Sequence, residues 1–181
     1  VFAALARVKH RSFDADLAAF AADASRPAAL RLRALLALSD AGGKLSDAAF
    51  DLLLGLAGDA GNLGQRIEAC HRLSEAPLTD AQLDRFLPVL MQAGPIEQGG
   101  FLRALRQYAP AQGRRIAAAF AHSPQLGTLR PDEVRVAFAK WPRAVFEEME
   151  PAFDAALACW TDLARRMGRY SVLAPLQARA A

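Results

Sequence analysis

The amino-acid sequence predicts an all-α fold built from antiparallel helix pairs, and three observations lead to that fold class. Hydrophobic residues make up 53% of the 181-residue chain, and most are alanine and leucine, which favour helices over strands. A stretch of related sequence recurs about every 33 residues, as in helical-repeat proteins. Helix-capping residues stand where each recurring helix should begin. Together these features predict a stack of similar helical units.

The clearest internal similarity joins residues 31–41 and 66–76. Arg31-Leu32-Arg33-Ala34 matches Arg66-Ile67-Glu68-Ala69, and each is followed by Leu-Ser-acid-Ala at 38–41 and 73–76. After a short gap of variable length, 45–48 matches 78–81. Such a gap is typical of a loop between two helices.

The second helix of each unit recurs every 33 residues along the chain. One set of equivalent positions holds large apolar residues: Leu17, Phe50, Leu83 and Ile116. A second set holds aspartate: Asp14, Asp47 and Asp80. Four units are detectable, the first and last being the most divergent, as expected of terminal repeats that have one neighbour. We predict that the four apolar residues occupy the same buried position in successive units.

Local signals define the two helices of a unit. In the second helix, one face collects apolar residues at helical spacing: Leu83, Phe86, Leu87, Leu90 and Met91. Thr79 with Gln82 predicts a capping box, Ser46 caps the preceding counterpart, and Gly94-Pro95 ends the helix. The first helix, opened by Pro27, is apolar on more than one side, which predicts burial against two neighbours. Its apolar residues are Leu30, Leu32, Leu35, Leu36 and Leu38.

The pattern changes beyond residue 122. Ser123-Pro124 interrupts the chain, Pro131-Asp132-Glu133 begins a helix with acids in its first turn, and Trp141-Pro142 ends it. A longer helix is predicted over 143–167, restarted or kinked at Pro151. We therefore predict helical repeats over 1–122, a helical cap over 123–168 and a tail over 169–181. The motifs of ankyrin and tetratricopeptide repeats are absent, so a HEAT-like α-solenoid fits best.

Composition and termini bear on the class of protein. No run of 18 uncharged apolar residues predicts a membrane span, and the start at Val1 indicates a segment of a longer protein. The net charge is +3, with arginine spread along the chain apart from 114–115 and 165–166, which favours a solvated surface over a nucleic-acid face. Cys70 and Cys159 could form a disulfide, but two buried thiols are favoured. The cysteines therefore do not indicate the cellular compartment of the protein.

Residues that could carry chemistry each have a structural interpretation. Cys70-His71 resembles the end of a c-type haem motif, but Ile67 stands where its first cysteine belongs. His71 is therefore interpreted as a core or interface residue, and His10 and His122 as caps at helix ends. The remaining candidates are an acidic run, a glycine series and two tryptophans: Glu147, Glu148 and Glu150; Gly55, Gly58, Gly61 and Gly64; Trp141 and Trp160.

We interpret the acidic run as a solvated face, the glycine series as a flexible connection between units, and the tryptophans as packing anchors. No catalytic, cofactor-binding or metal-ligating residue is predicted, and we expect no cofactor.

Several motifs resemble the HEAT-like region of a known family. The matching stretches are 76–83, 93–97, 116–120, 123–126, 129–134 and the pair Trp141-Pro142. Over about residues 30–157 the chain resembles the helical repeats of the large membrane-bound dehydrogenases of planctomycetes and verrucomicrobia. In these proteins the repeats lie between a propeller-type dehydrogenase domain and a C-terminal c-type haem domain.

The resemblance implies a non-catalytic spacer and protein-interaction module within a larger extracytoplasmic redox protein, with flanking domains or another protein as partners. No functional residue of the family transfers to this chain. Two alternatives remain open: a HEAT-like DNA glycosylase or other nucleic-acid-binding solenoid, and a cytoplasmic protein-binding scaffold. An Arg/Lys stripe with an aspartate and aromatics in a groove would favour the glycosylase, but the arginines are scattered.

Overall fold

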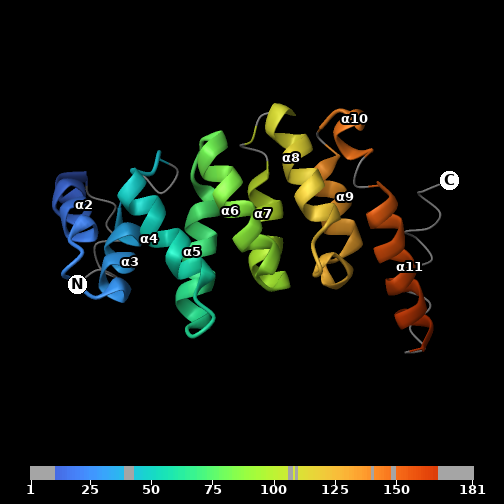
Figure 1. Cartoon of the computed structure of the whole chain (residues 1–181), viewed down its shortest axis with the longest axis horizontal. Coiled ribbons are helices and arrows are strands. Elements are labelled where there is room, and N and C mark those ends of the chain that lie inside the picture. Colours follow the sequence, from blue (N-terminus) through green and yellow to red (C-terminus); the bar gives the residue numbers. More distant parts are fainter. Residues whose placement is uncertain are drawn as a thin grey trace. The chain divides into compact units, whose positions relative to one another are not determined.

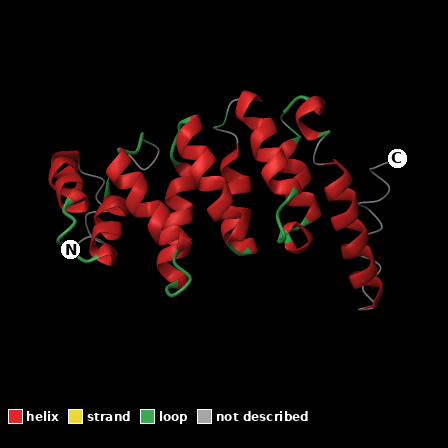
Figure 2. Ribbon diagram, viewed as in Figure 1, coloured by secondary structure: helices red, strands yellow, loops and turns green. Residues whose placement is uncertain are grey.

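The computed structural model describes residues 11–38, 43–105, 108, 110–139, 141–147 and 150–166. Over these residues the secondary structure is helical with connecting turns and without strands (Figure 2), so the predicted all-α class is confirmed. The chain divides into two compact units, Val1–Ala104 and Leu105–Ala181. We call them the N-terminal and the C-terminal unit. This division falls inside the predicted repeat region, and the predicted end of the repeats at residue 122 stays a prediction.

The N-terminal unit consists of two layers of helices (Figure 1). After a 3-10 turn at Arg11–Phe13, its helices are α2 (Asp14–Ala22), α3 (Ala28–Ala37), α4 (Asp47–Gly58), α5 (Leu63–Glu75), α6 (Asp80–Gln92) and α7 (Pro95–Ala104). Helices α2, α4 and α6 contact one another in order, and so do α3, α5 and α7. Each consecutive pair, α2–α3, α4–α5 and α6–α7, also packs together.

Side-chain caps mark where helices α4 and α6 begin. The Ser46 hydroxyl accepts a hydrogen bond from the backbone N–H of Ala49 at the start of α4. Thr79 and Gln82 form a complete capping box at the start of α6. Both predicted caps are confirmed, and α2, α4 and α6 each begin at one of the three equivalent aspartates of the sequence repeat.

The core of the N-terminal unit uses the predicted face of the second helices. Leu17, Phe50 and Leu83 are each the fourth residue of their helix, and all are buried. The predicted face of α6 is likewise buried along its length. Phe86 meets Phe101 of α7 edge to face, with ring centroids 5.8 Å apart, a favoured geometry for aromatic pairs.

The structure bears out the expectations for α3 and overturns that for the glycine series. Helix α3 contacts α2 and also α4 and α5, so the predicted burial against two neighbours is confirmed, although Leu30 is exposed. Pro27 directly precedes α3, and its carbonyl accepts the first hydrogen bonds of the helix. The glycine series is not a connection between units, because three of the four glycines are helical: Gly55 and Gly58 in α4, and Gly64 in α5. Burial of the α4 leucines outweighs the cost of about 1 kcal/mol for each helical glycine.

The C-terminal unit contains α8 (Pro110–Ala121), the 3-10 turn η3 (Leu126–Thr128), α9 (Pro131–Phe138), α10 (Arg143–Phe146) and α11 (Glu150–Arg166). Pro131 begins α9, as predicted. The helix predicted over 143–167 is two helices, and Pro151 lies at the start of the second. Ile116 is buried, but it is the seventh residue of α8. Its equivalence to Leu83 stays a prediction.

An aromatic cluster forms part of the C-terminal core. Phe138 packs edge to face against Phe120, at 5.9 Å between ring centroids, and against Trp141, at 5.2 Å. Gly113 of α8 admits Trp141, because a Cβ there would lie 3.0 Å from two indole carbons and 2.9 Å from Val145 Cγ1. A larger residue at this helical position would have to displace the indole of Trp141 or the side chain of Val145.

We expect Gly113→Ala to lower the free energy of unfolding by about 1–3 kcal/mol, because the new methyl group overpacks the indole. Gly55→Ala is the matched control, since a Cβ at Gly55 of α4 would meet nothing within 4 Å. That change should raise stability by about 0.5–1 kcal/mol through helix propensity. Urea denaturation followed by circular dichroism measures both. Equal stabilisation by the two substitutions would contradict the close approach at Gly113.

Candidate functional site

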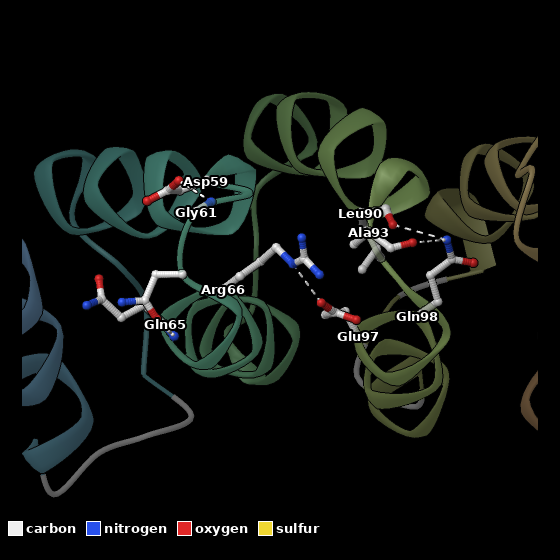
Figure 3. A network of polar contacts seen from close by, with 9 residues as sticks. Asp59, Gly61, Gln65, Arg66, Leu90, Ala93, Glu97 and Gln98 are labelled. Carbon is white, nitrogen blue, oxygen red and sulfur yellow. Dashed lines mark hydrogen bonds and ion pairs between the residues drawn. The ribbon is translucent and has the colours of Figure 1, made fainter.

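A partly buried ion pair joins α5 to α7 (Figure 3). Arg66 Nε donates to Glu97 Oε1 at 2.8 Å. The Glu97 side chain is 2% exposed and that of Arg66 is 23% exposed. Glu97 stands in the first turn of α7, where the helix dipole favours a carboxylate. The pair therefore fixes the first turns of α5 and α7 against each other.

The next residue, Gln98, holds the end of α6. Its Nε2 group lies 3.2 Å from three carbonyl oxygens, those of Leu90, Met91 and Ala93. Carbonyl groups at a helix C-terminus have no partner within the helix, and the fully buried Gln98 amide supplies one. Arg31 makes a similar contact between α3 and α2, because its Nε donates to the Ala21 carbonyl at 2.8 Å. These polar groups hold helices together.

Cys70 lies beside the ion pair and is fully buried, as predicted. Burial, helped by the nearby Glu97 carboxylate and opposed by Arg66, raises the pKa of its thiol to about 12. A thiolate is the reactive form of cysteine, so this thiol is inert at neutral pH. The side chain of Cys159 lies outside the described residues.

The raised pKa of Cys70 predicts a pH dependence of stability. The folded protein holds the thiol proton more tightly than the unfolded chain, whose pKa is near the ordinary 9.0. The free energy of unfolding should therefore fall as pH rises from about 9 towards about 12, by up to about 1.4 kcal/mol per pH unit. Cys70→Ala should remove this component of the slope. Identical slopes for wild type and variant between pH 9 and 11 would contradict the assignment.

The structure describes two of the three histidines, and their surroundings differ. His71 is exposed and lies 3.5 Å from Glu75, one turn further along α5. The core interpretation of His71 is therefore wrong, because Cys70 and Leu73 take the buried side of that helix. His122 follows α8 and its Nδ1 lies 2.8 Å from the Ala118 carbonyl, so the predicted cap is confirmed. His10 lies outside the described residues.

The other residues singled out from the sequence lie apart from one another. Glu147 and Glu150 are exposed, whereas Glu148 and the side chain of Trp160 lie outside the described part of the chain. Trp141 is half-buried against Phe138, in agreement with a packing role. Among the residues that the structure describes, no group of three His, Cys, Asp or Glu could hold a metal ion. Within the same residues, no helix has the length and apolarity needed to cross a membrane.

A cleft of about 470 Å³ opens in the N-terminal unit between α2, α3 and α4. Alanines and leucines make up most of its walls, and the charged residues Asp14, Lys44 and the buried Arg72 also line it. Ser46 also lines it, but its hydroxyl caps α4. No sequence pattern predicted this cleft. Alanines of α2 and α4 that line a cleft cannot be distinguished in the sequence from alanines that pack between helices.

Charge is divided between the two layers of the N-terminal unit. Helices α2, α4 and α6 contain six aspartates and one arginine, and helices α3, α5 and α7 contain five arginines and three glutamates. Asp51 of α4 pairs with Arg85 of α6 at 2.8 Å across the exposed acidic layer. This layer would repel a phosphate backbone.

Comparison of the chain with protein families, with curated proteins and with solved structures finds no match to any of them.

Proposed function

We propose that the chain is a HEAT-like helical-repeat module, without catalysis of its own, that binds other proteins or the domains that flank it. The observation that carries this proposal is the order of contacts in the N-terminal unit: α2, α4 and α6 begin at equivalent aspartates and pack successively, with α3, α5 and α7 as the second layer. In such arrays each unit contacts only its neighbours, and the array presents a broad surface.

The polar groups of the N-terminal unit support a role without catalysis. Glu97 is engaged with Arg66, Gln98 with the end of α6, and Arg31 with the end of α2. The one described cysteine thiol is buried with a raised pKa. Each of these groups has a structural task, whereas an active site needs groups left available to a substrate.

The sequence resemblance supports a narrower form of the proposal. In that form the module spaces and orients a dehydrogenase-like domain and a c-type haem domain of an extracytoplasmic redox protein. A helical array suits this task because it holds its two ends at a set separation. The isolated chain should then show no Soret absorbance and no stoichiometric metal, even when produced in a host that attaches haem efficiently.

Duplex DNA binding tests the proposal against the glycosylase alternative. Fluorescence anisotropy should show no saturable binding at about 150 mM salt with protein up to about 10 μM, because the acidic layer opposes phosphate contacts. An assay for base release from damaged duplexes should show none above background. Tight binding that weakens steeply with salt, accompanied by base release, would replace the interaction module with the glycosylase.

A further inference from the structure

We draw no further inference here: the strongest candidate, the cleft between α2, α3 and α4, carries nothing, because Asp14 lines it together with Lys44 and the buried Arg72, both Asp14 and Arg72 already interact within the protein, and nothing in the structure shows what would occupy it.

Discussion

Replacing Glu97 with alanine is expected to lower the free energy of unfolding by about 1.5–3 kcal/mol, the range for a hydrogen bond to a charged group. The substitution leaves the guanidinium of Arg66, which is only 23% exposed, without the carboxylate oxygen that lies 2.8 Å from its Nε. It also removes the link between the first turns of α5 and α7. Urea denaturation of the purified chain measures the loss.

Asp51→Ala is the matched control for Glu97→Ala. Asp51 pairs with Arg85 at the same 2.8 Å distance, but both side chains are 56% exposed, so its loss should cost less than about 1 kcal/mol. The double variant Arg66→Ala/Glu97→Ala should be more stable than the sum of the two single losses predicts. Equal costs for Glu97→Ala and Asp51→Ala would show that burial adds nothing to the α5–α7 pair.

Truncating a fully buried core side chain should lower the free energy of unfolding at least as much as Glu97→Ala does. Phe50→Ala should cost about 3–5 kcal/mol and Leu83→Ala about 2–5 kcal/mol, because each leaves a cavity where the side chain has no exposed surface. Leu63→Ala removes the same atoms as Leu83→Ala from a side chain that is 54% exposed. That control should change stability by no more than about 0.5 kcal/mol. If Leu83→Ala cost no more than Leu63→Ala, Leu83 would not be a core residue.

The features predicted correctly from the sequence depend on residues close together in the chain. A capping box needs only Thr79 and Gln82, and the buried face of α6 follows from apolar residues that recur once per helical turn. Pro131 with acids beside it marks the start of α9 for the same reason. Such signals give the helices and their starts without knowledge of the rest of the fold.

The features that sequence reasoning missed depend on contacts between distant residues. Glu97 and Arg66 are 31 positions apart, and nothing local shows that a glutamate in the first turn of α7 is buried. The burial of the α4 leucines kept Gly55 and Gly58 helical, although their spacing predicted a loop.

Calorimetric titration of residues 1–181 with the flanking domains that the proposed function invokes, a dehydrogenase-like domain and a c-type haem domain, each expressed separately, tests the central claim most directly. An interaction module should dock to at least one of them with a measurable heat and a defined stoichiometry. A negative heat-capacity change should accompany docking, because apolar surface is buried. Docking to none of the flanking polypeptides, together with tight duplex DNA binding and base release by the chain alone, would contradict the account.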